Sequence, residues 1–311
     1  MVTTLAAIAD NPLTGDAFDR LYDDKIKSEL EKREVDRKAA MQTFRAIIGA
    51  GIAVMVMESG LTFQFTHGAT FMPDVRILVV TMVGFAALSY LPLAQVAAKA
   101  KVGVIKALCG ALGMTYRAKG QLSAFQTFQT LRLLEHPDDS SFEDHFEGVR
   151  ASCAFELCEA TLTRGSGKNR TTVFRGQLFR IAFPRKFLGT TVVLRDSGWL
   201  NRFECPPHLS KVGLEDVHFE KIFEVFGSDQ VEARAILTPA FMQQLVDLET
   251  AYAGHHIRCA FTDGDLLIAI EAPNRFEIGG MFKTLVDRSR VETIARDIGA
   301  VFQLVDSFIP A

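Results

Sequence analysis

Two acids and a base follow one another at Asp229, Glu232 and Arg234, beside the apolar residues Val231, Ala233 and Ala235. If this stretch is a strand, Glu232 and Arg234 lie on the same face, because alternate side chains of a strand point the same way. A partly buried carboxylate in a cleft can act as a general acid or base. We expect instead a structural cluster in which Arg234 is partly buried and paired with Glu232 or Asp229, with an interaction or catalytic site as the alternative.

Two single residues also stand out by their surroundings. Glu58 is the only formal charge within Ala46–Phe65, and an acid inside a membrane span is a functional candidate. We expect the helix to end at Ser59-Gly60, which would place Glu58 at the membrane interface; a role inside a helix bundle is the alternative. Trp199 is the sole tryptophan. We expect it in a turn packed on the core, with an interfacial anchor near lipid headgroups as the alternative.

Other candidate motifs in the sequence do not have the residue spacing that their chemistry requires. The segment Gly165-Ser166-Gly167-Lys168 resembles a phosphate-binding loop, but Leu162 and Asn169 occupy the places where that motif needs a glycine and a hydroxyl residue. Cys205 and His208 are metal-ligand types at close spacing, without a second close pair to complete a tetrahedral site. The sequence therefore assigns no catalytic residue, no metal site and no cofactor.

The elements that would position these residues begin with two apolar segments, Ala46–Phe65 and Ile77–Val96. A helix of 20 residues covers about 30 Å, the hydrocarbon thickness of a bilayer. Only residues 66–76 separate the two segments, so the spans must be antiparallel. The sequence thus predicts a transmembrane helical hairpin, with a buried hairpin of a soluble protein as the alternative.

Basic residues flank the hairpin on one side. The connecting loop holds only Arg76, whereas many bases precede the first span and follow the second: Lys25, Lys27, Lys32, Arg33, Arg37, Lys38, Arg45, Lys99, Lys101, Lys106, Arg117 and Lys119. Because positive residues stay on the cytoplasmic side, we expect a multi-pass membrane protein with both termini cytoplasmic.

The remainder reads as an α+β domain with an antiparallel sheet, because hairpins follow one another in succession. The apolar runs Ala151–Thr163 and Thr171–Phe183 flank one turn, and Ile257–Phe261 and Leu266–Ala272 flank the turn signal Asp263-Gly264. Thr238-Pro239 is a helix start signal. We expect a juxtamembrane helix at residues 1–45, the hairpin at 46–96, a helical linker at 97–140 and the cytosolic domain at 141–311.

Composition excludes several classes of protein. The chain has 311 residues, 48% of them hydrophobic and 23% charged, with a net charge of −3 and five cysteines. It lacks the basic field that binds nucleic acid, so we expect no nucleic-acid partner. An odd, scattered cysteine count is not typical of a disulfide scaffold.

Two long phrases carry a resemblance, Gly176–Asp196 (GQLFRIAFPRKFLGTTVVLRD) and Leu214–Leu245, which contains DQVEARAILTPAF. They resemble the bacterial membrane-anchored family catalogued as domain of unknown function 3137. Members of that family have a helical N-terminal stretch, two membrane spans and a cytosolic domain, and the match extends over residues 142–302. The resemblance implies a bacterial inner-membrane location and an assembly with LemA-like membrane proteins, but no activity and no catalytic residues.

These observations predict a membrane-anchored scaffold or regulatory protein. Its partners would be the lipid bilayer and a protein or lipid surface bound by the cytosolic domain. The alternative is a membrane-surface hydrolase acting on lipid or peptide. The sequence indicates neither the oligomeric state nor a ligand.

Overall fold

A computed structural model of the chain describes residues 13, 15–65, 75–183, 186–196, 206, 208–251, 257–277 and 282–308. The chain divides into two compact units. The sheet unit contains residues 109–276 and 295–311, and the helical unit contains residues 15–108 and 277–294.

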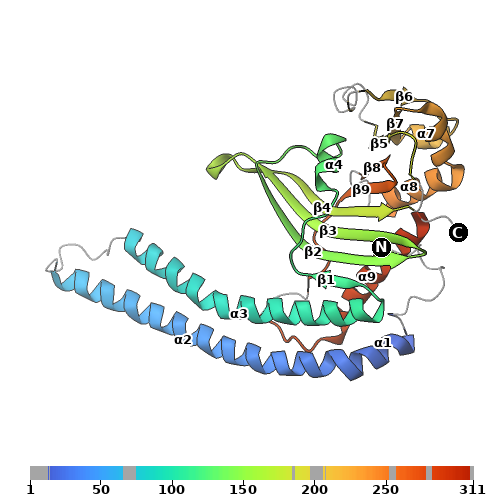
Figure 1. Ribbon diagram of the computed structural model, residues 1–311. Helices are drawn as coiled ribbons and strands as arrows, with labels where there is room; N and C mark the ends of the chain where they lie inside the picture. The colour runs from blue at the N-terminus through green and yellow to red at the C-terminus, as the bar shows by residue number, and fades with distance from the viewer. Residues whose placement is uncertain are drawn as a thin grey trace. The chain divides into compact units, whose positions relative to one another are not determined.

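The helical unit is a long antiparallel hairpin (Figure 1). Its first arm contains α1 (Gly15–Leu21), a π-helical turn η1 (Tyr22–Ile26) and α2 (Lys27–Phe65), and its second arm is α3 (Val75–Ala111). At 1.5 Å per residue, α2 and α3 are each about 55 Å long, well beyond the thickness of a bilayer core. Pro92 lies inside α3, where it removes one helical hydrogen bond.

The sheet unit is built on one nine-stranded sheet in the order β1-β2-β3-β4-β9-β8-β5-β7-β6. All neighbouring strands are antiparallel. The strands are β1 (Thr115–Arg117), β2 (Asp139–Arg150), β3 (Cys153–Arg164), β4 (Thr171–Ala182), β5 (Thr191–Arg195), β6 (Ser210–Val212), β7 (Phe223–Gly227), β8 (Ile257–Thr262) and β9 (Asp265–Glu271). The α+β class and the antiparallel sheet are therefore confirmed.

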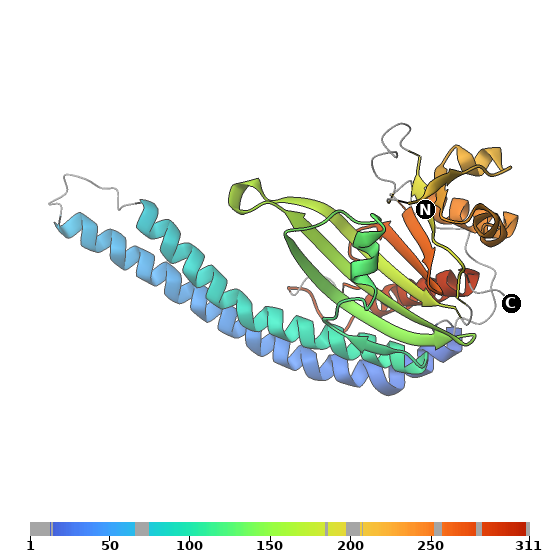
Figure 2. The same ribbon diagram turned by 45° about the horizontal axis from the view of Figure 1, so that its top comes forward.

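The helices of the sheet unit cover both faces of the sheet. They are α4 (Phe125–Thr130), α6 (Val217–Glu220), α7 (Gln230–Ile236), α8 (Pro239–Ala251) and α9 (Arg288–Phe308), whose first residues belong to the helical unit. On one face, α4 packs through Phe125 and Phe128 on a buried cluster that includes Leu178 and Leu267. On the opposite face, Phe241 of α8 contacts Phe261 at 5.2 Å between ring centroids, and Figure 2 shows α9 running behind the strands.

Local chemistry explains the main turns and helix starts. Asp263 and Gly264 have φ angles of 52° and 98°, which is the left-handed conformation that a two-residue hairpin turn requires. The hairpin β8–β9 is therefore where the Asp-Gly signal predicts it. The Thr238 hydroxyl accepts a hydrogen bond from the backbone N–H of Phe241 at 3.3 Å, so it caps α8 as expected.

Several elements differ from expectation. Within the helical linker expected at residues 97–140, residues 97–111 continue α3, residues 115–117 form the strand β1, and α4 has only six residues. The helix α2 does not end at Ser59-Gly60 but continues to Phe65. The stretch that holds Asp229, Glu232 and Arg234 begins the helix α7, directly after the strand β7.

Candidate functional site

The distal part of the hairpin exposes its apolar side chains. We call residues 46–65 of α2 and 75–91 of α3 the apolar arm. Twelve large apolar side chains of this arm are at least 45% exposed: Ile52, Val56, Met57, Leu61, Ile77, Val79, Val80, Met82, Val83, Leu88, Tyr90 and Leu91. Within each of the two most apolar windows only 11% of the residues are buried. By length and composition both helices are able to cross a membrane, and their exposed surface is unlike that of a core helix of a soluble protein.

The proximal part of the same hairpin has the opposite pattern. We call residues 15–45 and 92–108 the stalk, where apolar side chains such as Ile26, Leu30 and Ile105 are fully buried and charged residues occupy the surface. Surface ion pairs at helical spacing, such as Arg33 with Glu29 at 2.8 Å, run along α2. This is the pattern of a helix pair in water.

A segment from the far end of the sequence packs on the stalk. We call residues 282–294 the strap. The Glu34 side chain is buried and accepts a hydrogen bond from the backbone N–H of Leu285 at 2.9 Å. Arg37 donates two more hydrogen bonds to the Glu34 carboxylate, at 2.8 and 2.7 Å. The bonds from Arg37 lower the pKa of Glu34, so the carboxylate stays charged where it holds the strap.

Glu58 lies inside the apolar arm and faces the other helix. The Thr81 hydroxyl of α3 donates a hydrogen bond to the Glu58 carboxylate, at 3.3 Å to the nearer oxygen. A few residues away, Gly51 of α2 lies so close to Phe85 that a Cβ there would be 2.8 Å from the ring. The expectation that the helix ends at Ser59-Gly60, directly after Glu58, is therefore wrong, because α2 continues to Phe65. The Glu58 carboxylate joins the two helices.

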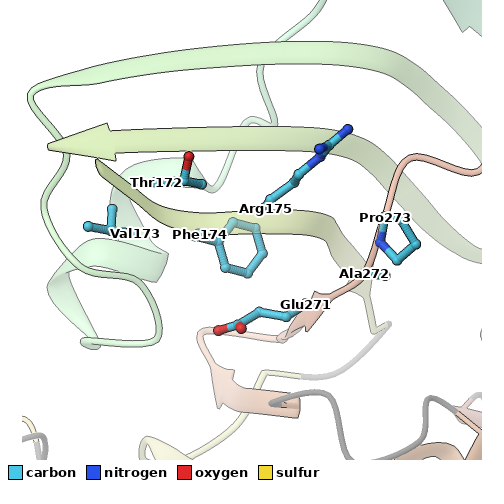
Figure 3. Close-up of a pocket in the computed structure, with 7 residues that line it drawn as sticks. All are labelled: Thr172, Val173, Phe174, Arg175, Glu271, Ala272 and Pro273. Atoms are coloured by element: carbon cyan, nitrogen blue, oxygen red, sulfur yellow. The ribbon is translucent and has the colours of Figure 1, made fainter. Parts of the chain in front are cut away.

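A groove lies in the sheet unit where the first residues of β4 extend beyond the last residue of its antiparallel neighbour β9. The pairing of β4 with β9 begins at Gly176 opposite Glu271, so residues 171–175 of β4 extend beyond it. Pro273 follows soon after and has no N–H to donate. The resulting groove has a volume of about 380 Å³ and is lined by Thr172, Val173, Phe174, Arg175, Glu271, Ala272 and Pro273 (Figure 3).

The polar groups of the groove come from both strands. Arg258 of β8 donates a hydrogen bond to the Glu271 carboxylate at 2.6 Å and so fixes its position. The Arg175 side chain is exposed and donates through Nε to Asn274 at 3.2 Å. With the Thr172 hydroxyl, these groups can bind a polar or charged ligand. The lining residues do not include a nucleophile with an adjacent general base, which acyl transfer would need.

A second polar cluster lies at the other end of the same strands, around His145. Its side chain is only 4% exposed, with Nδ1 3.4 Å from Glu147 and Nε2 3.8 Å from Glu156. Neither ring nitrogen has a hydrogen-bond partner within the part of the chain that the structure describes. Burial lowers the pKa of His145, although both carboxylates act in the opposite direction. The imidazole is thus held neutral and is closed to a substrate in this structure.

The rest of this cluster is fully connected. Glu156 accepts hydrogen bonds from the Ser123 backbone and hydroxyl and from Arg180, at 3.0, 2.6 and 2.8 Å. Burial alone would raise the pKa of Glu156, but these bonds outweigh it and lower the pKa. Arg180 also contacts Asp265 at 2.8 Å. The network ties β3, β4 and β9 to the segment before α4, which is a structural role.

The cluster predicted from the sequence is a helix start rather than a strand. Asp229 caps α7, since its carboxylate accepts from the N–H groups of Val231 and Glu232. Glu232 accepts from the N–H of Leu188 at 2.5 Å and from that of Gly189. Arg234 is exposed and donates to the carbonyl of Gly213 at 3.1 Å. The expected buried pairing of Arg234 is therefore wrong, because a helix turns its side chain away from both acids and toward solvent.

The other residues singled out in the sequence have simpler outcomes. Trp199 lies outside the described residues, as does Cys205. Residues 165–168 form the turn of the β3–β4 hairpin with the short helix η2 (Gly167–Asn169). The described cysteines are all free and buried; burial raises the pKa of Cys109, Cys158 and Cys259 to about 12, so these thiols are unreactive.

Sequence reasoning missed the groove, the cluster at His145 and the strap. One signal was present for the groove, because Ala272-Pro273 marks where β9 must stop pairing. For the start of α7 a signal was also present, because Asp229 precedes Glu232 by three residues, and an acid three residues before a glutamate is typical of a helix start. The contact of Glu34 with Leu285 joins residues 251 positions apart, and local patterns hold no signal for it.

Comparisons with known proteins give one family. Residues 172–309 match the family described as protein of unknown function (DUF3137). No curated protein matches the chain. Among solved structures, the crystal structure of the mycobacterial trehalose monomycolate transport factor A (TtfA) is similar over 66% of this chain and 94% of that one, at 10% identity and a TM-score of 0.29; a likeness this low carries no argument. The part of the chain from residue 172 to 309 is thus similar to the DUF3137 domain, a domain of unknown function.

Proposed function

We propose that this protein is a membrane-anchored binding protein, a scaffold or regulatory subunit whose sheet domain binds a partner protein at the membrane surface. The observation that carries the proposal is the exposed surface of the apolar arm. Its large apolar side chains are uncovered on both helices, and such a surface is stable in lipid and unfavourable in water.

The charge pattern supports an orientation. Both helices change from apolar to charged at the same end of the hairpin, and the bases Lys38, Arg45, Lys99 and Lys101 flank that end. By the positive-inside rule the stalk and both termini are cytoplasmic, and in a bacterial cell this membrane would be the inner one. The lengths of α2 and α3 leave about 25 Å of stalk outside the bilayer.

The groove between β4 and β9 supports a binding function for the sheet domain. It combines a strand that extends past its neighbour, a fixed carboxylate at Glu271 and an exposed guanidinium at Arg175. An extended segment of a partner protein fits such an edge, because its backbone can continue the pairing of β4.

Membrane insertion and orientation are tested by cysteine labelling of the full chain in a Cys205→Ser background. The remaining cysteines are buried and should not react. In spheroplasts, an impermeant maleimide should label Gly68→Cys from outside and Ser166→Cys only after lysis. The reverse pattern would overturn the orientation, and release of the protein by alkaline carbonate would overturn the anchor.

Partner binding is tested by a photo-crosslinking amino acid at Thr172 in living cells. A discrete adduct with one protein, lost on Arg175→Glu, would support the groove. The matched control places the same amino acid at Val231, which is 77% exposed on α7. Equal adducts from both positions would show that the groove is not the binding surface.

A further inference from the structure

The strap brings an exposed aromatic ring to the boundary between the stalk and the apolar arm. Phe282 is 56% exposed, and its ring lies edge-on to that of Phe44, at 5.5 Å between centroids. Phe44 is two residues before Ala46, where the apolar arm begins. The ring of Phe282 therefore lies at the level where α2 changes from a charged to an apolar surface.

The chain is fixed to the stalk on both sides of this ring. Before it, the Glu277 carboxylate accepts from Lys101 of α3 at 3.0 Å. After it, the N–H of Leu285 is bonded to the buried Glu34, and the Leu285 side chain is itself buried. Both anchor points lie on the stalk. Phe44, which the Phe282 ring contacts, is ten residues after Glu34 and so lies about 15 Å further along α2. The position of the ring is thus set by contacts with the stalk.

The surface beside the ring is basic. Lys283 and Arg45 are both exposed, one following Phe282 and the other following Phe44. An exposed aromatic ring with adjacent bases, at the level where an apolar surface starts, suits the headgroup region of a bilayer. There the ring enters the acyl boundary while the bases meet anionic headgroups.

We propose that Phe282 and Lys283 form an interfacial membrane anchor, which seats the strap on the anionic leaflet through which the hairpin passes. This inference rests on the proposed membrane anchoring of the hairpin. It gives the membrane a second contact, made by residues more than 180 positions after the spans in the sequence. Because the strap includes the first residues of α9, its contact with the bilayer would hold this part of the segment that matches DUF3137 at the membrane surface.

The test uses the full chain with one tryptophan, reconstituted in vesicles that contain brominated lipids. Trp199→Phe removes the native tryptophan, and Phe282→Trp introduces a similar ring at the proposed anchor. We expect lipids brominated near the headgroup to quench this fluorescence more than lipids brominated deep in the chain. Val80→Trp in the apolar arm should show the opposite order, and Val35→Trp in the stalk should not be quenched.

The three positions separate the two claims. Quenching at Val80→Trp without quenching at Phe282→Trp overturns the anchor and leaves the proposed function in place. Absence of quenching at Val80→Trp overturns the proposed function itself. A melting curve in detergent that matches the parent protein shows that each variant is folded.

The kind of lipid that the anchor prefers is tested by changing the lipid composition of the vesicles. Quenching at Phe282→Trp should be stronger in vesicles that contain phosphatidylglycerol than in phosphatidylcholine alone, and Lys283→Gln should reduce the difference. Equal quenching in both vesicles would overturn the requirement for an anionic leaflet.

Discussion

The apolar arm and the stalk are parts of the same two helices, yet their surfaces are opposite. Val56 and Val80 in the arm are 67% and 71% exposed and have large apolar neighbours that are also exposed. In the stalk, apolar side chains such as Leu30 are buried and charges face outward. A continuous helix can therefore have different surroundings along its length, and the kind of side chain that is exposed in each part indicates which surroundings that part has.

The two carboxylates of the hairpin show the same contrast. Glu34 in the stalk has three hydrogen bonds, two of them from a guanidinium. Glu58 in the arm has a threonine hydroxyl as its partner across the hairpin. A charged partner strengthens a hydrogen bond where water is near, and a neutral hydroxyl is the kind of partner that joins helices within a bilayer.

The largest expected effect comes from charges placed on the arm. The double substitution Val56→Lys with Val80→Lys should abolish stable membrane insertion, because each lysine near the centre of a span costs about 2.5–3.5 kcal/mol. Alkaline carbonate extraction measures the membrane-bound fraction. Val35→Lys is the matched control, since Val35 is 68% exposed but lies in the stalk. Equal extraction of the control and the double variant would break the comparison.

The next effect concerns the strap. Glu34→Gln should weaken the hydrogen bonding of this side chain with Leu285 and Arg37 by about 1.5–3 kcal/mol, the typical contribution of a hydrogen bond to a charged group. Limited proteolysis of the detergent-solubilised chain should then cut within residues 277–290 faster than in the parent protein. Glu31→Gln, an exposed neighbour on the same helix, should have no effect. An unchanged cleavage rate in Glu34→Gln would show that the strap does not depend on this carboxylate.

A smaller effect is expected at the close approach of the two helices. Gly51→Leu places a side chain against Phe85 and should destabilise the hairpin by about 1–3 kcal/mol, as overpacking does in cores. A Cβ at Gly49 meets open space, so Gly49→Leu should leave stability unchanged. Thermal unfolding in detergent compares the two variants, and Phe85→Ala should rescue the first. Identical unfolding of both leucine variants would contradict the packing of α2 on α3.

The smallest effect belongs to the sheet unit and follows from His145. Burial lowers the pKa of this residue in the folded state, so the unfolded state binds the proton more readily. Stability should be constant above the ordinary histidine pKa of about 6.5 and fall as the pH drops below it, by at most about 1.4 kcal/mol for each unit of pKa shift. Thermal unfolding at pH 7.5 and 5.5 measures the difference, which His145→Asn should reduce, while membrane retention stays unchanged. If the parent protein had the same stability at both pH values, the lowered pKa of His145 would be contradicted.

The sequence was sufficient for features that depend on local periodicity and turn chemistry. The hairpin follows from two apolar runs with a short connection, β8–β9 from Asp263-Gly264, and the start of α8 from Thr238. The alternation of apolar and polar residues at 229–234 fits either a strand or a short helix, and the capping by Asp229 decides for the helix.

The elements that the sequence could not give depend on distant contacts. β1 and β6 are three residues long and exist only through pairing with β2 and β7. The groove arises from a difference in length between β4 and β9, whose paired residues lie 83 to 95 positions apart in the sequence, and the strap arises from contacts across most of the chain. Neither the groove nor the strap has a repeating pattern of apolar and polar residues that would reveal it in the sequence.

The central claim, that one hairpin passes from water into lipid, is tested most directly by spin labels along it. Cysteines at Val35, Val56 and Val80, in the Cys205→Ser background, carry the label in the full chain reconstituted in vesicles. Labels at Val56 and Val80 should be relaxed by oxygen far more than by a water-soluble nickel chelate, and the label at Val35 should show the reverse. If all three positions are relaxed mainly by the nickel chelate, the hairpin lies in water and the account is wrong.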